Sequence, residues 1–405
     1  MPENNITGAR MDEMRGLQKR LKKELQHFHM SNAPFWGASI DESVFRLLHT
    51  RMSSPGVRSY FLFKVAQYIQ AMAEKDGYTL RACPDPNLFR TTIPFLAESI
   101  ISVQYYHNQI LDRKGGVGTP ETIGNTLIAG NLLRSFLERY IESRVIDPMI
   151  AEKLLHCTSK IFELVDVAQF MDKNWGSYEA FTKGVPKNTE LRKDIELFCA
   201  HAPLEQAWAI MQSHGIQTRH HDFTQLYLKR AWLANAPLLI ILGELIMDTM
   251  GYSGKERAKV IQFASEYGLL VQLTNDTIDL LPPETVDKGK QDSFSDLKNG
   301  TVSLPYLFYF NFHPDQDLKT LQRRLRRNEA GLLRDFLPLI DNVCIPVVNT
   351  YANAIGAHID LTYGELLQNM RTMGTEDNKY FRRYKGAFAG LPKRFQKRYT
   401  KLIPD

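Results

Sequence analysis

The feature that most constrains this fold is the spacing of its apolar residues, which recur every three or four positions along most of the chain. This period matches one face of an α-helix, whereas the alternation of apolar and polar residues that is typical of strands hardly occurs. Glycine or proline pairs separate the apolar stretches. We therefore predict an all-α protein, with helices over about residues 12–30, 41–52, 58–75, 91–112, 122–142, 147–171, 190–213, 223–250, 255–281, 301–311, 315–328, 329–343, 345–371 and 378–401.

The 405 residues carry a formal net charge of +5, and the excess lies at the two ends of the chain. Residues 10–24 are rich in Lys and Arg, and residues 380–401 hold eight Lys or Arg residues and no acid. So mild a charge over this length argues against a nucleic-acid partner. The pattern predicts a basic N-terminal extension over residues 1–34, one helical domain over 35–375 and a basic, aromatic tail over 376–405.

The C-terminal tail interleaves its cations with aromatic residues, among them Phe381, Tyr384, Phe388, Phe395 and Tyr399. A segment of this composition suits the anionic surface of a membrane. We therefore expect peripheral membrane contact through the tail. The alternative is a helix that packs on the domain and leaves its basic face in water.

The remaining composition favours a cytoplasmic protein. Its four cysteines are far apart and form no CxxC pair, so neither a disulfide framework nor a zinc site is indicated. The first residues lack the apolar core of a signal peptide. The most apolar stretch, residues 231–247, is interrupted by Asn235, Pro237 and Glu244, so we expect a buried core helix there and not a membrane span.

Two of the apolar helices carry lines of polar residues. In residues 95–112, the side chains of Gln104, Asn108 and Asp112 are four positions apart and share one face. Because the helices are otherwise apolar, we expect these side chains to point into an interior, where carboxylates need a cation or a metal as partner. The second line, in residues 268–280, consists of Gln272, Asn275, Asp276 and Asp279.

The second line, the loop after it and residues 295–305 resemble the second half of a trans-isoprenyl diphosphate synthase. That family places Q-x-x-D-D-x-x-D on a core helix, then Gly-Lys in a loop, then D-L-x-x-G-K-x-T-L-P. Upstream, Tyr227 and Lys229 resemble its Y-x-K-T motif, and Asn108 and Asp112 fall in its first acidic motif. The resemblance covers about residues 40–365, and its downstream matches are Gln272, Asn275, Asp276, Asp279, Gly289, Lys290, Asp296, Leu297, Gly300, Leu304 and Pro305.

The resemblance implies an isoprenoid-synthase helical bundle with a central apolar cavity, assembled as a homodimer. It also implies an allylic prenyl diphosphate as the substrate and Mg²⁺ as the cofactor, since the metal neutralises the leaving diphosphate. The residues it assigns to catalysis are Asp112, Asp276 and Asp279, and those it assigns to the metal are Asn108, Asp112, Asn275, Asp276 and Asp279. The residues it assigns to the diphosphate are Arg58, Arg113, Lys114, Lys229, Lys290 and Gln272.

The chain departs from the family pattern in both acidic motifs. Asn108 and Gln109 stand where the first motif has aspartates, and Asn275 stands at the first aspartate of the second motif. Amides bring no charge, so they weaken Mg²⁺ binding. The positions that hold isopentenyl diphosphate in the family have also lost cationic or polar side chains; these are now Val57, Tyr60, Ile101 and Thr301.

We therefore expect an enzyme that ionises one allylic prenyl diphosphate and either cyclises the cation or passes it to an acceptor other than isopentenyl diphosphate. A non-catalytic regulatory or lipid-binding member of the family is the first alternative, because the lost carboxylates remove charge that catalysis needs. A chain-elongating synthase is the second alternative. The sequence leaves the prenyl chain length and the acceptor open.

Overall fold

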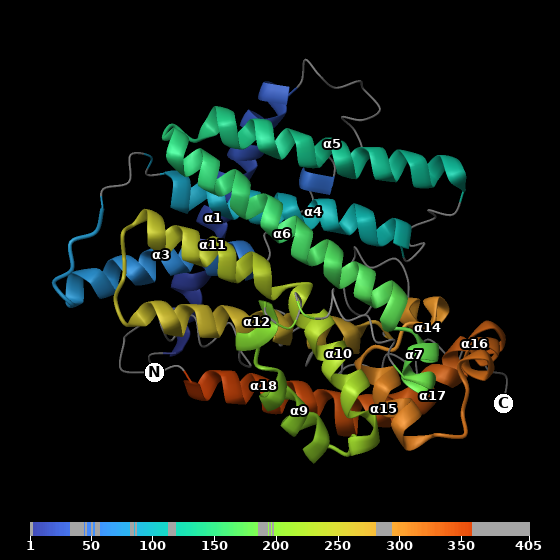
Figure 1. Ribbon diagram of the computed structural model, residues 1–405. Helices are drawn as coiled ribbons and strands as arrows, with labels where there is room; N and C mark the ends of the chain where they lie inside the picture. Colours follow the sequence, from blue (N-terminus) through green and yellow to red (C-terminus); the bar gives the residue numbers. More distant parts are fainter. Residues whose placement is uncertain are drawn as a thin grey trace. The chain divides into compact units, whose positions relative to one another are not determined.

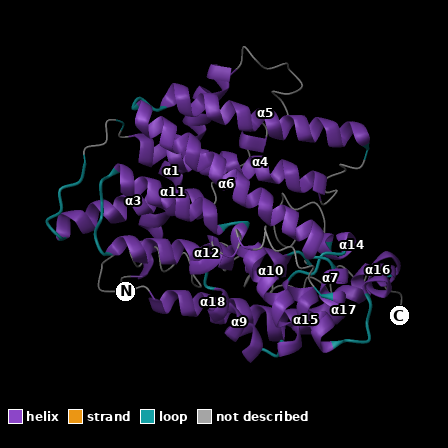
Figure 2. Cartoon of the chain, in the orientation of Figure 1, coloured by secondary structure: helices purple, strands orange, loops and turns teal. Residues whose placement is uncertain are grey.

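The computed structural model describes residues 3–32, 57–81, 87–111, 119–184, 198–280 and 294–358, together with residues 44, 47–49, 52, 85, 193 and 196. Within these ranges the elements are helices, and strand pairing is limited to one isolated antiparallel bridge between Ser177 and Thr301. Figure 2 shows this helical content directly. The all-α prediction is confirmed.

The chain forms two compact units. Of the described residues, the first unit contains those up to Glu163 and Leu238–Ala264, and the second contains Leu164–Pro237 and those from Ser265 onward. The boundaries fall within the helices α6 (Pro148–Trp175), α11 (Ala236–Thr249) and α12 (Glu256–Ile278). The sequence-based division at residues 34 and 375 stays a prediction.

The first unit is built around α4 (Ile93–Leu111), whose residues 93–103 are all buried. This helix packs against α3 (Val57–Lys75) and α5 (Pro120–Arg144), and α4 and α5 lie side by side (Figure 1). Helix α5 begins two residues before the predicted start at residue 122, because the Thr119 side chain accepts a 3.2 Å hydrogen bond from the Thr122 amide and Pro120 needs no amide partner.

Helix α1 (Glu3–Asn32) also belongs to this unit and contacts α4 and α5. Its apolar face is buried, with Leu21 and Phe28 fully inaccessible. On the same helix, the Glu24 carboxylate accepts hydrogen bonds from the Tyr140 hydroxyl (2.8 Å) and from Arg144 Nε (2.6 Å) on α5. The described part of the predicted basic extension is therefore a packed helix.

The second unit contains the end of α6, most of the C-terminal half of α12, and a set of shorter helices. Among these, α9 contacts α10 and α18, α15 contacts α17, and α14 contacts α16. The shorter helices are α7 (Tyr178–Lys183), α9 (Leu204–Ser213), α10 (His221–Leu233), α14 (Ser295–Asn299), α15 (Leu304–Phe312), α16 (Leu318–Arg327), α17 (Glu329–Leu339) and α18 (Ile345–His358).

The prediction of one helix over residues 223–250 is wrong, because the chain turns at Ala234 and Asn235 between α10 and α11. Pro237 lies in the first turn of α11, where its missing amide costs no hydrogen bond, but it could not have continued a helix that began upstream. A Cβ on Gly268 of α12 would lie 2.4 Å from the Cα of Ala236, so α12 approaches this turn closely.

No single helix within the described ranges is long and apolar enough to cross a bilayer. Thr218–Leu233 and Ala236–Thr249 reach that length and hydropathy only as a bent pair. Within this stretch Leu233, Leu239 and Leu242 are fully buried in the protein, as expected for a core segment.

Candidate functional site

The second polar line lies in the second unit and is largely buried, with Asp279 directly after the last residue of α12. Asp276 and Asp279 expose only 6% and 8% of their surface, and Gln272 and Asn275 are half-buried. The expectation that the two carboxylates point into an interior is therefore confirmed. Both carboxylates must then find partners nearby.

Asp276 is held by a chain of side-chain hydrogen bonds. Tyr227 of α10 donates to Oδ2 at 2.7 Å, and Gln272 donates to Oδ1 at 2.6 Å. The amide oxygen of Gln272 in turn accepts a 2.7 Å hydrogen bond from Asn235, at the turn that follows α10. The break between α10 and α11 thus supplies a side chain that orients Gln272 toward Asp276.

Burial raises the pKa of Asp276 above its ordinary value, and the nearby charge of Asp279 adds to this effect. The positive charge of Arg230 and the hydrogen bonds from Tyr227 and Gln272 act in the opposite direction. Burial and the Asp276 carboxylate together raise the pKa of Tyr227, so its hydroxyl remains a hydrogen-bond donor.

Asp279 accepts hydrogen bonds from the start of α14. The Ser295 hydroxyl donates to one carboxylate oxygen, and the backbone amide of Asp296 donates to the other at 3.2 Å. Phe294, immediately before α14, has a left-handed backbone with φ of 57°, and its amide donates to the Asp279 carbonyl at 3.0 Å. The carboxylate of Asp279 therefore caps α14, a role for which acids at helix N-termini are suited.

Arg230 is a buried cation that the sequence did not single out, although it follows Lys229 directly. It is 7% exposed and forms an ion pair with Asp172 near the end of α6. Its Nη2 donates to the Val302 carbonyl at 3.3 Å, and its guanidinium carbon lies 5.2 Å from the Tyr227 ring centroid. No spacing rule pairs Arg230 with Asp172, because the two residues lie on helices far apart in the chain.

Gly176 makes room for this ion pair. A Cβ at this position would lie 2.5 Å from Arg230 Nη1 and 2.7 Å from the Asp172 carbonyl oxygen. The Gly176 carbonyl also accepts a 2.7 Å hydrogen bond from the Val302 amide. The end of α6 and the segment before α15 are thus tied together next to Arg230.

Lys229 lines a cavity of about 330 Å³ in the second unit. Its ammonium lies 3.6 Å from the Glu196 carboxylate, and its side chain is 22% exposed. An anionic ligand of Lys229 would therefore compete with Glu196. The sequence predicted Lys229 as a diphosphate ligand, but it gave no sign of this internal partner.

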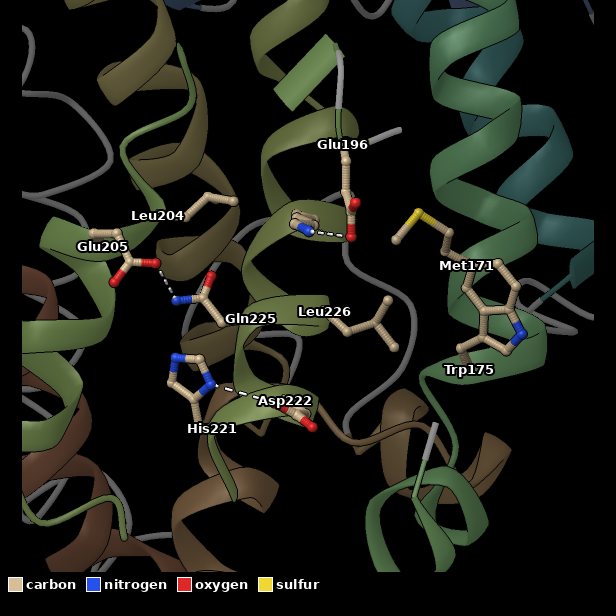
Figure 3. A pocket seen from close by; sticks show the side chains of 10 residues that line it. Met171, Trp175, Glu196, Leu204, Glu205, His221, Asp222, Gln225 and Leu226 are labelled. Carbon is tan, nitrogen blue, oxygen red and sulfur yellow. Dashed lines mark hydrogen bonds and ion pairs between the residues drawn. The ribbon is translucent and has the colours of Figure 1, made fainter. Parts of the chain in front are cut away.

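The cavity has an apolar wall and a charged rim. Met171, Trp175, Leu204 and Leu226 form the apolar wall. On the rim, Glu205 accepts a 2.9 Å hydrogen bond from Gln225, and His221 Nδ1 lies 3.3 Å from the Asp222 carboxylate. Figure 3 shows both pairs. The rim therefore carries three carboxylates, with Lys229 as the cation among the lining residues.

The polar line on α4 belongs to the first unit. Asn108 is exposed, so the expectation that it points into an interior is wrong, whereas Gln104 is half-buried. Arg58 lies half-buried in the first turn of α3, next to Ser59, whose hydroxyl donates a 2.6 Å hydrogen bond to the buried Glu98 of α4. Four of the predicted site residues lie outside the described residues; these are Asp112, Arg113, Lys114 and Lys290.

No model of a known protein family matches this chain, and no curated protein matches it in sequence. Solved structures do match. A geranylgeranyl pyrophosphate synthase from Corynebacterium glutamicum, complexed with isoprenyl diphosphate and magnesium, aligns with a TM-score of 0.59 at 10% identity over 91% of this chain and 98% of its own. A heptaprenyl diphosphate synthase from Staphylococcus aureus aligns with a TM-score of 0.54 at 18% identity over 91% and 97% of the two chains. This chain has the prenyl diphosphate synthase fold.

A third structure with the prenyl diphosphate synthase fold is a polyprenyl synthase from Caulobacter crescentus, complexed with calcium and isoprenyl diphosphate. It aligns with a TM-score of 0.58 at 13% identity over 94% of this chain and 98% of its own. The predicted fold is thus confirmed by proteins of low sequence identity. Two of these three proteins were crystallised with a divalent metal and an isoprenyl diphosphate.

The hydrogen-bond partners of Asp276 and Asp279 bear on whether these carboxylates could bind such a metal. Asp276 and Asp279 both accept hydrogen bonds at each of their carboxylate oxygens. The described residues also contain no group of three or more His, Cys, Asp or Glu side chains that could hold a metal ion. A divalent metal at Asp276 or Asp279 would therefore compete with these hydrogen bonds.

Proposed function

We propose that this protein is a prenyltransferase-like enzyme that binds one allylic prenyl diphosphate and ionises it. The observation that carries the proposal is the buried Asp276 network on α12, within a prenyl diphosphate synthase fold; Tyr227 of this network lies two residues before Lys229 on α10. Asp276, Gln272 and Lys229 occupy the motif positions that the resemblance assigns to catalysis and diphosphate binding. The fold and these positions support the same substrate class.

In the proposed reaction, the bond between C1 and the diphosphate oxygen breaks and its electron pair leaves with the diphosphate. The allylic cation then either cyclises by attack of a double bond of its own chain or alkylates an acceptor, and loss of a proton restores neutrality. Lys229 would bind diphosphate oxygens in place of Glu196, and Gln272 would donate to the diphosphate from its position beside Asp276. A bound divalent cation would lower the barrier by neutralising the leaving group, and Asn108 and Asp112 stay its predicted ligands.

We propose an acceptor other than isopentenyl diphosphate because other residue types occupy the positions that would bind isopentenyl diphosphate. Tyr60, where the resemblance places an arginine, is 1% exposed and donates a 3.1 Å hydrogen bond to Glu13 of α1. Ile101 and Thr301 are each 8% exposed and bring no charge. These positions support packing and offer little to a second diphosphate.

The enzyme proposal is tested with purified protein, Mg²⁺ and geranyl, farnesyl or geranylgeranyl diphosphate. We expect release of pyrophosphate from at least one substrate, and its loss in Asp276→Asn. If none of the three substrates releases pyrophosphate, with or without cell extract as a source of acceptor, the proposal is overturned. Incorporation of labelled isopentenyl diphosphate would instead establish the chain-elongating alternative, whose products match those of the similar solved structures.

A non-catalytic regulatory or lipid-binding role is the second candidate. It is favoured by the partners of Asp279, because a carboxylate that caps α14 serves the fold and not a substrate. In this case Asp112→Ala and Asp279→Ala, expressed in cells at wild-type levels, should leave the cellular function intact. A non-hydrolysable farnesyl diphosphate analogue should still bind without turnover.

We also propose that the protein is a cytoplasmic homodimer. On α5 of the first unit, Leu127 and Ile128 are 45% and 53% exposed, which is unusual for adjacent aliphatic residues on a helix. Light scattering of the full chain should give twice the 46.5 kDa mass, and Leu127→Glu should shift it toward the single-chain value. A monomeric wild-type protein would exclude the dimer.

Membrane contact through residues 376–405 is proposed from the sequence of that tail, which lies outside the described residues. Liposomes that contain anionic lipid should sediment the full chain but not a chain truncated at residue 375. Equal sedimentation of both proteins would exclude the tail as the contact.

A further inference from the structure

Arg230 lies in a compact charged cluster of the second unit. The Arg230 cluster consists of Arg230, Asp172, Tyr227 and Asp276. Its guanidinium is 7% exposed, forms an ion pair with Asp172 and donates to the Val302 carbonyl at 3.3 Å. A guanidinium does not lose its proton in a protein, so this site carries a permanent positive charge.

Tyr227 contacts both Arg230 and Asp276. The guanidinium carbon of Arg230 lies 5.2 Å from the Tyr227 ring centroid, and the Tyr227 hydroxyl donates to Asp276 Oδ2 at 2.7 Å. One fixed cation thus pairs with Asp172 and contacts the same tyrosine that donates its hydroxyl hydrogen to Asp276.

The surrounding backbone is shaped for this cation. Gly176 leaves the space that the guanidinium and the Asp172 carbonyl need, since a Cβ there would lie 2.5 Å from Arg230 Nη1. Val302 receives the Arg230 hydrogen bond at its carbonyl and donates its own amide to the Gly176 carbonyl at 2.7 Å. A buried charge with this many partners is part of the architecture and not a surface residue that happened to turn inward.

We propose that Arg230 is a resident cation that replaces a divalent metal at Asp276. A Mg²⁺ ion demands several oxygen ligands in near-octahedral geometry, and the oxygens of Asp276 already accept hydrogen bonds from Tyr227 and Gln272. A divalent ion at Asp276 would also be repelled by the fixed charge of Arg230. Asp276 therefore binds no divalent metal, and any metal requirement of the protein arises from other residues.

The test uses the full chain without substrate and Mn²⁺ as the probe. Bound metal is read from the loss of the free-ion EPR signal and from the shift in Tm. Every variant carries Asp112→Asn, so that the predicted acid of the first motif does not contribute. We expect this parent protein to bind no Mn²⁺ at about 1 mM, and the additional change Arg230→Gln to increase the affinity at least about tenfold.

Two further variants establish the location of the gained site. Adding Asp276→Asn to the Arg230→Gln protein should remove the Mn²⁺ binding again. The matched control is Arg134→Gln, because the Arg134 guanidinium lies 4.7 Å from the Phe162 ring centroid, outside the Arg230 cluster. This control should bind no more Mn²⁺ than the parent.

Two results would overturn the inference. One is Mn²⁺ binding by the parent protein that disappears with Asp276→Asn, and this comparison decides the matter even where Arg230→Gln does not fold. The other is a folded Arg230→Gln protein with the same Mn²⁺ affinity as its parent. The inference concerns the site of the proposed function but not its turnover, so a failed pyrophosphate assay leaves this metal titration unaffected.

Discussion

The Tyr227 hydroxyl donates a 2.7 Å hydrogen bond to the Asp276 carboxylate, and both side chains are almost completely buried. This contact joins α10 to α12 within the second unit. Helix α10 carries the residues that resemble the Y-x-K-T motif, and α12 carries those that resemble the second acidic motif. The sequence did not show that Tyr227 of the first motif contacts Asp276 of the second.

Tyr227→Phe should destabilise the protein by about 1–3 kcal/mol, because it leaves a buried carboxylate with one hydrogen bond fewer. Urea unfolding at pH 7 measures this free energy. The matched control is Tyr178→Phe, whose hydroxyl donates a longer 3.2 Å hydrogen bond to the Gln316 carbonyl at a partly exposed position. Equal losses in the two variants would contradict the special role of the Tyr227 hydroxyl.

Gly176→Ala and Gly124→Ala should shift stability in opposite directions. At Gly176 the added methyl would meet Arg230 Nη1 at 2.5 Å and backbone at 2.7 Å, so we expect a loss of about 1–3 kcal/mol. At Gly124, inside α5, nothing lies within 4 Å of the added Cβ, and alanine should stabilise the helix by about 0.5–1 kcal/mol. Thermal unfolding of both variants provides the measurement, and a stabilised Gly176→Ala protein would rule out the close approach.

Glu24→Ala should destabilise the protein by about 2–3 kcal/mol, because it leaves the buried Tyr140 hydroxyl and Arg144 without their shared acceptor. Asp12→Ala on the same helix is the control. Its ion pair with Arg15 is highly exposed, at 76% and 70%, so its loss should change stability by less than about 1 kcal/mol. Chemical unfolding of both variants distinguishes a packed α1 from a loosely attached one, in which the two losses would be similar.

His220 should make stability fall as the pH falls below about 6.5. Burial is the larger cause that lowers the pKa of His220, and the charge of Arg219 is the smaller one. The His220 ring stacks on Phe181 with centroids 4.5 Å apart. The unfolded chain therefore binds the proton at a higher pH than the folded one, so stability is lost as the pH falls through 6.5 toward the folded pKa.

Unfolding midpoints between about pH 5.5 and 7.5 test this dependence. His220→Gln should flatten the pH profile relative to wild type. His156→Gln, which removes a histidine from the exposed surface of α6, corrects for the loss of one histidine. The same change of slope in both variants would contradict the prediction.

Local pattern was sufficient for the helical architecture. The apolar period over residues 91–112 predicted α4, because this signal acts over a few neighbouring residues. The prediction of one helix was wrong at the turn after α10. There the apolar spacing continues through Asn235, but the helix does not. Close packing of Gly268 on Ala236 accompanies that turn, and a contact between distant segments leaves no trace in local periodicity.

By itself, the sequence determined that the chain is helical, that Asp276 lies on an apolar helix, and which family's motifs Asp276 and Asp279 resemble. Only the tertiary structure decided how each carboxylate is used. Asp276 receives Tyr227 and Gln272, Asp279 caps α14, and Arg230 pairs with Asp172. The physical reason is that the effect of a buried charge depends on its neighbours in space, and residues from different helices become neighbours only when the chain is folded.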